Sequence, residues 1–494
     1  MSVSVVAHQY LVIVVSAFGS ILASHQEPRN ALSSDQIHGE VSMITRKEMA
    51  SDHDIESGDN IGSESSMPFS NSSTLRFDQE PFETFQHKVA ALCEELEFGT
   101  PCVIEHMTGG SFNRIIGLRF ATLRRRSRLL KSLGILKACV CWLIRCNPTA
   151  TGQRLILRIP RKHPDALEKA AEIKDQVCVL QELAHHFPVA RVIAYDTSRK
   201  NAIGAPWVLQ NRLEGHPLNY VYPIMDVQTR KEIVALVAGA IANMERITFN
   251  RHGQFVAPRS MPDRLLDAEK LNVCPELADI KLKGGEAILD DGNLSVYGFL
   301  SKLLESQQQK EEKKGIEGYD LVENWMQLAE ILKDMKDAGI LTDVSSVLWH
   351  WDFAARNILV KKIRGKWQIT GIVDWDGAMA VPKVIARKPP AWMWHHSEPS
   401  GWSWTGGLDF QLVRPLTADE AEVKRQFDDL IEKLLPGYKE DAYGPGRWVR
   451  RLARFAIYGF GCAEDWQRCE TFIREWRKEK RRSIRTSLPL QTTL

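Results

Sequence analysis

The sequence lacks the features that define several large classes of protein. Its main apolar run near the N-terminus, Tyr10–Ala23, is shorter than the roughly 20 residues that a transmembrane helix needs. None of its nine cysteines forms a Cys-x-x-Cys pair, so we expect reduced thiols rather than a disulfide framework or a structural zinc site. The 64 Lys and Arg residues nearly cancel the 62 Asp and Glu residues, so a global field that would attract nucleic acid or a membrane is absent.

The two ends of the chain differ in composition from the region between them. Residues 1–23 contain an apolar core like that of a signal peptide, but no Lys or Arg precedes it. We therefore expect a cytoplasmic protein, with a signal peptide as the alternative. The polar stretch from residue 33 to about residue 73 has too few apolar residues to order itself and predicts a disordered leader. At the other end, Ile473–Arg485 is a basic run, which we interpret as a solvated helix end.

The region between the ends changes from strand patterns to helical patterns. Short apolar segments dominate up to Leu213, and long helical patterns follow, among them 227–247 and 319–338. This order predicts an α+β fold with two lobes, a small β-rich N-lobe and a larger helical C-lobe. The boundaries that we expect are 1–80 for the leader, 81–213 for the N-lobe, 214–470 for the C-lobe and 471–494 for a basic tail.

One stretch of the expected N-lobe contains no acidic residue. Between Glu105 and Asp165 every formally charged side chain is basic, and residues 121–150 interrupt two segments that would otherwise join as a hairpin. Three explanations remain open: a basic helical insertion, translated non-coding sequence from a faulty gene model, and a helix that lies on a membrane surface. The gene-model explanation accounts best for the flanking segments.

A histidine–aspartate segment carries the strongest chemical signal. It reads His-Trp-Asp-Phe-Ala-Ala-Arg-Asn at 350–357, and Asp374 follows Asn357 by seventeen residues. Phosphoryl transfer needs a carboxylate that orients or deprotonates the attacking hydroxyl, and oxygen ligands that hold Mg²⁺ against the nucleotide phosphates. We therefore predict Asp352 as the catalytic base, and Asn357 and Asp374 as metal ligands. Capping of turns is the structural alternative for such side chains.

These motifs, HWDFAARNILV and GIVDWDGA, resemble the aminoglycoside phosphotransferase family, and more narrowly its large fungal branch. The resemblance extends from about residue 81 to about residue 460. It implies a protein-kinase-like fold and transfer of the γ-phosphate of a nucleotide to a hydroxyl group of a small molecule, with Mg²⁺. The motifs are specific to the fold and not to a substrate, so they do not name the acceptor.

The resemblance also implies that ATP, or alternatively GTP, binds between the lobes. Gly109, Gly110 and Ser111 lie where the family has its phosphate-covering turn, whose backbone N–H groups approach phosphate oxygens closely. Arg158 lies where the family usually has a lysine that grips the α- and β-phosphates. Arginine and lysine are not interchangeable, so this arginine need not take the role of the lysine. Pairing with a nearby carboxylate is its alternative role.

Two further positions follow from the same resemblance. The segment 208–213 lies where backbone groups receive the adenine edge, so we expect Gln210 and Leu213 to bind the cofactor. The helix after the phosphate-gripping cation should carry a glutamate that holds this cation, but the matching position is Gln176, which has no charge. Either Glu172, one helical turn earlier, replaces the glutamate, or the clamp is weaker than usual.

Three features outside these motifs also require interpretation. His350 is expected to orient the catalytic loop rather than to carry a proton. Asp376 is either a supporting carboxylate near the metal or a cap for the turn that follows. The tryptophan-rich segment 389–404 either binds an amine through cation–π attraction or packs against the helical lobe, and we favour packing.

Taken together, these observations predict a phosphotransferase that uses ATP and Mg²⁺ and acts on a hydroxyl group of a small molecule. We expect no nucleic-acid partner and no stable membrane span, and the sequence predicts no oligomeric state. A catalytically weak or inactive kinase-like binding protein is the alternative, favoured by Gln176 and by the basic stretch. A true protein kinase is disfavoured because no Ala-Pro-Glu segment follows Asp374.

Overall fold

The computed structural model describes residues 79–107, 112–120, 152–161, 166–258, 260–266, 279–284, 287–289, 295–314, 321–341, 345–395, 415–461 and 463–487. These residues all belong to one of the two compact units of the chain, Glu64–Leu494, and the other unit is Met1–Ser63. Three predicted features lie outside the described residues. They are the leader up to residue 78, the glycine turn with Gly109, Gly110 and Ser111, and the stretch 121–150.

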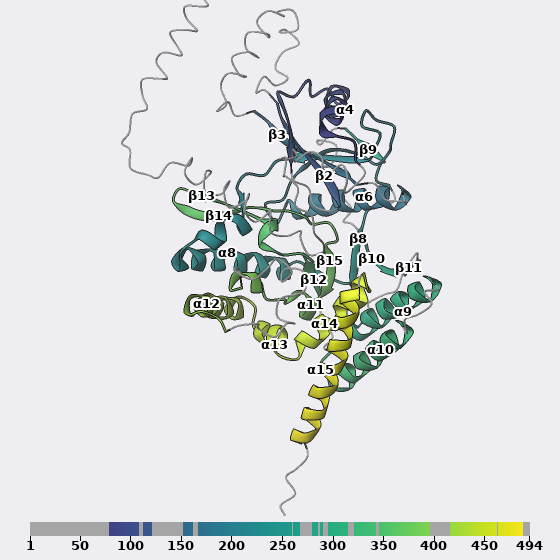
Figure 1. The fold of residues 1–494 in the computed structure, drawn as a ribbon, viewed down its shortest axis with the longest axis vertical. Coiled ribbons are helices and arrows are strands. Elements are labelled where there is room, and N and C mark those ends of the chain that lie inside the picture. Colours follow the sequence, from purple (N-terminus) through teal and green to yellow (C-terminus); the bar gives the residue numbers. More distant parts are fainter. Residues whose placement is uncertain are drawn as a thin grey trace, which may run out of the picture. The chain divides into compact units, whose positions relative to one another are not determined.

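The N-lobe is built on an antiparallel sheet with the strand order β1-β2-β3-β5-β4-β9 (Figure 1). In helix α4, Phe85, Val89 and Leu92 recur at helical spacing, and they are buried together with Leu155 and Leu157 of the sheet. Helix α6 packs against β4. The elements are α4 (Phe82–Glu95), β1 (Val103–Met107), β2 (Asn113–Arg119), β3 (Arg154–Pro160), α6 (Ala166–Leu183), β4 (Val192–Asp196), β5 (Trp207–Asn211) and β9 (Arg264–Leu265).

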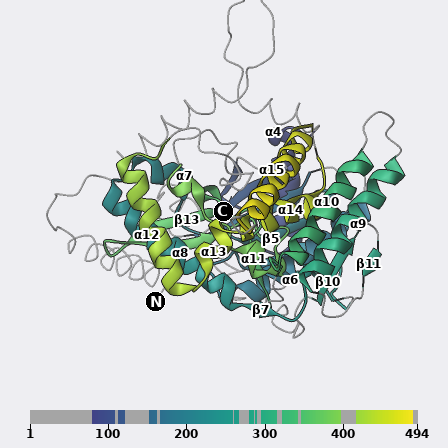
Figure 2. The ribbon, with the colours of Figure 1, turned by 90° about the horizontal axis from the view of Figure 1, so that it is seen from below.

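The C-lobe is mainly helical. Helices α8 and α12 pack against each other, and α10 contacts α9, α14 and α15, as Figures 1 and 2 show. The helices are α7 (Leu218–Val221), α8 (Val227–Arg246), α9 (Val296–Lys314), α10 (Leu321–Asp337), α11 (Lys383–Ala386), α12 (Ala418–Leu434), α13 (Tyr438–Tyr443), α14 (Gly446–Tyr458) and α15 (Ala463–Ser487). Short 3₁₀ turns occur at Tyr222–Ile224, Ala355–Asn357 and Ala391–Met393.

The C-lobe also contains two β-sheets. One has the strand order β11-β10-β8-β15-β12-β7, and the other has the order β14-β13-β6. Their strands are β6 (His216–Pro217), β7 (Thr248–Phe249), β8 (Gly253–Val256), β10 (Asp279–Gly284), β11 (Ala287–Leu289), β12 (Ser346–Trp349), β13 (Ile358–Ile363), β14 (Lys366–Ile372) and β15 (Met379–Pro382). The described residues confirm the α+β, two-lobed plan predicted from the sequence, with a β-rich N-lobe and a mainly helical C-lobe.

The hydrophobic core of the C-lobe has two parts. One part joins α6, α8, α12 and the hairpin of β13 and β14, and it includes Val237, Phe427 and Ile372. The other part joins α9, α10, α14 and α15, and it includes Trp325 and Phe472. Because the hairpin belongs to the first part, burial of its apolar side chains fixes the chain on both sides of the predicted active site.

The basic run near the C-terminus belongs to α15. Ile473 and Trp476 are buried, whereas the charged side chains beside them are in contact with solvent. The Lys480 ammonium pairs with the Asp334 carboxylate of α10 at 2.6 Å. Within the described residues, no helix has both the length and the apolar character needed to cross a membrane.

The described part of the tryptophan-rich segment packs against the protein. Trp394 is fully buried, and the indole N–H of Trp392 donates to the carbonyl of Phe353 at 3.2 Å. These contacts agree with the packing interpretation for both rings. Trp402 and Trp404 lie outside the described residues.

Candidate active site

The catalytic loop is held by hydrogen bonds that converge on Asp352. The Asn357 amide nitrogen donates to the Asp352 carbonyl at 2.9 Å and to its Oδ2 atom at 2.8 Å. The Arg356 guanidinium donates to the same Oδ2 atom at 2.6 Å. Only 10% of the Asp352 side chain is exposed, so these donors fix its orientation in a partly dry environment.

His350 connects this loop to the strand that leads to Asp374. The backbone N–H of Asp352 donates to His350 Nδ1 at 3.3 Å, so the proton of the neutral ring is on Nε2. That nitrogen lies 3.0 Å from the carbonyl of Val373, to which it donates. Burial lowers the pKa of His350 below its usual value and keeps the ring neutral. These contacts are those of a residue that orients a loop.

Asp374 follows the end of the β13–β14 hairpin. The N–H of Val373 donates to the Asn357 carbonyl at 2.9 Å, so the hairpin returns the chain directly to the catalytic loop. Asp374 has a left-handed backbone, with φ of 65°, a conformation that Asp and Asn adopt more readily than most residues. The structure thus brings the three predicted catalytic and metal-binding residues, Asp352, Asn357 and Asp374, into one region.

Asp374 is expected to lower the stability of the ligand-free protein as the pH rises from about 4 to about 6. Burial and then the negative charge of Asp376 raise its pKa from 3.8 to about 6. An acid with a raised pKa contributes stability below its unfolded pKa and loses this contribution as the pH rises through its folded pKa. Because 45% of the side chain is exposed, solvent screening makes the effect modest.

The measurement for this prediction is the melting temperature of Asp374→Asn and of the unmodified protein over the same pH series. The difference between them should move in favour of the variant up to about pH 6 and then stay constant. A difference that does not change with pH would show that the carboxyl is not perturbed.

Arg158 projects from the N-lobe sheet toward these carboxylates. Its strand neighbours Leu157 and Ile159 belong to the core beneath α4, so the alternation along β3 directs Arg158 to the opposite face. Its Nη2 atom lies 2.5 Å from Asp376 Oδ2 and 3.9 Å from Asp374 Oδ1. The structure therefore pairs Arg158 with a nearby carboxylate, which was the alternative role, and this carboxylate belongs to Asp376, which follows the β13–β14 hairpin.

Gln210 lies on the same face of the sheet as Arg158. The strand register sets Val208 opposite Arg158 and Gln210 opposite Ile156, two residues along both strands. Gln210 is 8% exposed, and its buried Oε1 atom has no hydrogen-bond partner in the described part of the chain. A buried acceptor without a partner fits a ligand that donates a hydrogen bond, such as the amino group of adenine.

Leu213 lies after β5, beside the hairpin. A Cβ atom built on Gly371 would come within 2.8 Å of Leu213 Cδ1 and 3.0 Å of Leu359 Cδ1, so the absence of a side chain at Gly371 lets Leu213 approach β14. Gln210 and Leu213 thus lie on the segment that connects the two lobes. Gly109, Gly110 and Ser111, the other expected cofactor-binding residues, lie outside the described residues.

The donor atoms near Asp374 fit Mg²⁺. Because the Asn357 amide nitrogen donates to Asp352, its Oδ1 atom is the one that could bind a cation. Mg²⁺ prefers oxygen ligands and is commonly held by one or two carboxylates together with substrate phosphates and water. Among the described residues, no group of three or more His, Cys, Asp or Glu side chains is arranged to hold a metal ion without such help.

Residues 147–384 match the model of the phosphotransferase enzyme family. This part of the chain, just under half of its length, is similar to that family. The family segment includes Arg158 on β3, the catalytic loop and the hairpin that precedes Asp374, whereas α4, β1 and β2 precede it. No curated protein matches the chain.

Three solved structures align with most of the chain at low identity. Aminoglycoside phosphotransferase APH(4)-Ia, with AMP-PNP and hygromycin B, is 14% identical over 78% of this chain and 98% of its own, with a TM-score of 0.40. ADP-bound APH(2'')-Ib is 10% identical over 79% and 96%, with a TM-score of 0.41. Ethanolamine kinase of Plasmodium vivax is 11% identical over 87% and 96%, with a TM-score of 0.39. All three TM-scores are below 0.5.

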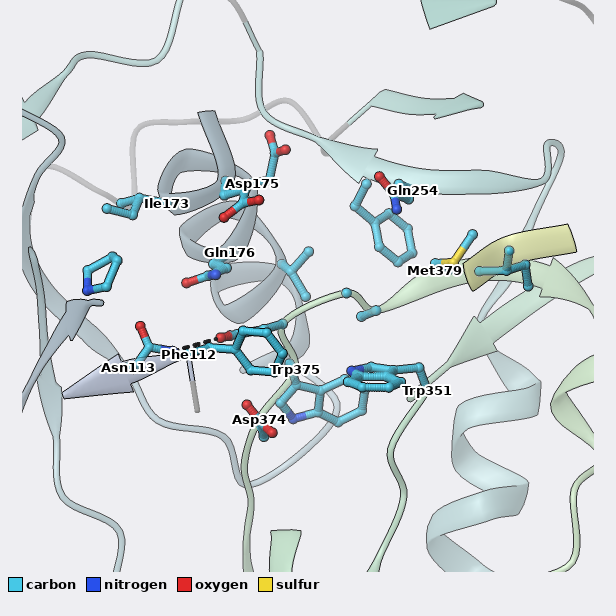
Figure 3. A pocket seen from close by; sticks show the side chains of 18 of the residues that line it. Phe112, Asn113, Ile173, Asp175, Gln176, Gln254, Trp351, Asp374, Trp375 and Met379 are labelled. Atoms are coloured by element: carbon cyan, nitrogen blue, oxygen red, sulfur yellow. Dashed lines mark hydrogen bonds between the residues drawn. The ribbon is translucent and has the colours of Figure 1, made fainter. Parts of the chain in front are cut away.

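A cavity of about 360 Å³ lies beside residues 374–379, which follow the β13–β14 hairpin (Figure 3). Its wall includes the carboxylates of Glu172, Asp175, Asp374 and Asp376, and no Lys, Arg or His of the described chain lines it. Its aromatic rings belong to Phe112, Phe255, Trp351, Trp375 and Tyr458.

The sequence analysis did not predict two features of the candidate site. It left Asp376 without a definite partner, and it did not identify the cavity. The sequence contains part of the signal for the partner of Asp376. It shows that Asp376 lies two residues after Asp374 and that Gln176 has no charge, but it does not show that Asp376 lies beside Arg158. The cavity had no comparable signal, because its wall combines residues from both lobes.

Proposed function

We propose that this protein transfers the γ-phosphate of ATP to a hydroxyl group of a small molecule, with Mg²⁺ as cofactor. The observation that carries the proposal is the geometry of Asp352, whose Oδ2 atom is occupied by Asn357 and Arg356. Its Oδ1 atom is then the one available to orient the acceptor hydroxyl and to receive its proton. Placement in the fungal branch of the family stays a prediction.

The proposed division of labour follows from the positions of the side chains. Arg158 binds nucleotide phosphates, Gln210 and Leu213 receive the base, and Asn357 and Asp374 hold the metal ion. When bound, Mg²⁺ supplies positive charge that offsets the negative charge of the phosphates. Since phosphoryl transfer has a loose transition state, positioning and charge stabilisation by these residues supply most of the acceleration.

We propose that the cavity beside the hairpin receives the acceptor and favours a neutral or positively charged molecule. Four carboxylates and five aromatic rings line it, without a basic side chain in the described part of the chain. Carboxylates repel an anionic acceptor, and aromatic faces attract a cation.

A matched acceptor panel tests the proposed function. Nucleotide-dependent formation of a phosphate ester should be at least about tenfold faster with amino alcohols than with hydroxy acids of equal size, with ATP and GTP tried separately. The measurement is ADP or GDP release, with mass spectrometry of the product. Equal rates with both classes would refute the charge preference. Nucleotide binding without turnover on any acceptor would instead favour the binding-protein alternative, which the uncharged Gln176 supports.

A further inference from the structure

One carboxylate of the C-lobe receives two side chains from the N-lobe sheet. The Arg158 guanidinium donates to Asp376 Oδ2 at 2.5 Å, and the Asn113 amide donates to the same oxygen at 3.3 Å. The second of these bonds is the dashed line at Asn113 in Figure 3. The side chains of Arg158 and Asp376 are 13% and 24% exposed, so solvent screens the pair only partly. We refer to Arg158, Asn113 and Asp376 as the inter-lobe clamp.

The residue of α6 at the position expected to hold this arginine carries no charge. Gln176, at the position where a glutamate was expected, lines the same cavity as Asp376 but is neutral. Asp175 accepts a hydrogen bond from the N–H of Ala257 at 2.7 Å and so is engaged with the C-lobe. The Arg158 guanidinium lies instead 2.5 Å from the Asp376 carboxylate and 3.9 Å from the Asp374 carboxylate.

We propose that Asp376, instead of an acidic residue on α6, is the positioning residue that holds Arg158 ready for the nucleotide phosphates. The proposal rests on the proposed function, since it assigns a role around the same nucleotide site. The clamp spans the lobes, so the position of the phosphate-binding cation and that of the metal ligand Asp374 are set by one segment, Asp374–Asp376.

The clamp also keeps Arg158 away from Asp374. The two side chains are 3.9 Å apart, and a buried guanidinium that loses its partner turns to the nearest remaining carboxylate. Without Asp376, Arg158 would therefore pair with Asp374 and compete with Mg²⁺ for the same oxygen atoms. Loss of Asp376 is thus expected to weaken the binding of both the nucleotide and the metal ion.

The test is Asp376→Asn, alone and combined with Gln176→Glu, in the full chain. Asp376→Asn should weaken Mg-ATP binding by about 10–100-fold and raise the Mg²⁺ concentration needed for half-maximal binding. Gln176→Glu should restore at least part of this loss, because it supplies a carboxylate of the same shape from α6. Asp429→Asn, an exposed acid on α12, is the matched control. Unchanged binding in Asp376→Asn overturns the proposal, and so does a loss that Gln176→Glu leaves unrepaired.

A second measurement separates this proposal from the proposed function. Thermal unfolding without nucleotide is compared for Arg158→Met, Asp376→Asn and the double variant. The two shifts in melting temperature should be clearly non-additive if the ion pair forms in solution, whatever the protein catalyses. Additive shifts overturn the clamp itself. If the shifts are non-additive but the unmodified protein binds no Mg-ATP, the ion pair stands as a structural contact and its role toward nucleotide is overturned.

Discussion

Asp352→Asn is expected to lower turnover by about 10²–10⁴-fold while affinity for Mg-ATP stays nearly unchanged. Asparagine keeps the shape of the side chain and can still accept the hydrogen bonds of Arg356 and Asn357 through its carbonyl oxygen. It cannot accept a proton from the acceptor hydroxyl. The variant therefore removes the proposed base and leaves the loop in place.

Steady-state rates with a responsive acceptor, together with a direct nucleotide-binding titration, check this expectation. Asp429→Asn, which removes an exposed carboxylate on α12, should keep the rate of the unmodified protein. Turnover that persists in Asp352→Asn would refute the assignment of the base. A parallel loss of nucleotide affinity would mean that the side chain maintains the structure of the nucleotide site.

Asp374→Asn is expected to abolish the stabilisation of the protein by Mg-nucleotide. A ligand at about a hundred times its dissociation constant stabilises the folded state by roughly 2.7 kcal/mol, which gives a clear shift in melting temperature. Asparagine tolerates the left-handed backbone at this position, so the variant removes the charge without straining the turn. The loss of the shift would then report on metal ligation and not on unfolding.

Thermal unfolding with nucleotide alone, Mg²⁺ alone and both together is the measurement. The unmodified protein should respond most strongly to the combination, and Asp374→Asn should respond to the combination no more than to nucleotide alone. A full Mg-dependent shift in the variant would remove Asp374 from the set of metal ligands and leave the hairpin with another role.

Local sequence patterns were sufficient to predict the architecture. Apolar residues at helical spacing predicted α8 and α10, and the change from short apolar segments to long helical patterns predicted the two lobes. These signals are readable because the period of 3.6 residues in a helix and of two in a strand is set by backbone geometry within a few residues. The catalytic loop is equally local, since Asp352 and Asn357 are five residues apart and bond to each other directly.

The sequence by itself therefore determined the two-lobed plan and the loop around Asp352. The partner of Arg158 was decided by the tertiary structure alone, because Asp376 lies 218 residues further along the chain. No periodicity extends over such a distance, and several carboxylates near the site were equally acceptable in charge. The choice among them depended on how the sheet of the N-lobe packs against the segment that follows the β13–β14 hairpin. Burial of apolar side chains in both lobes determines this packing.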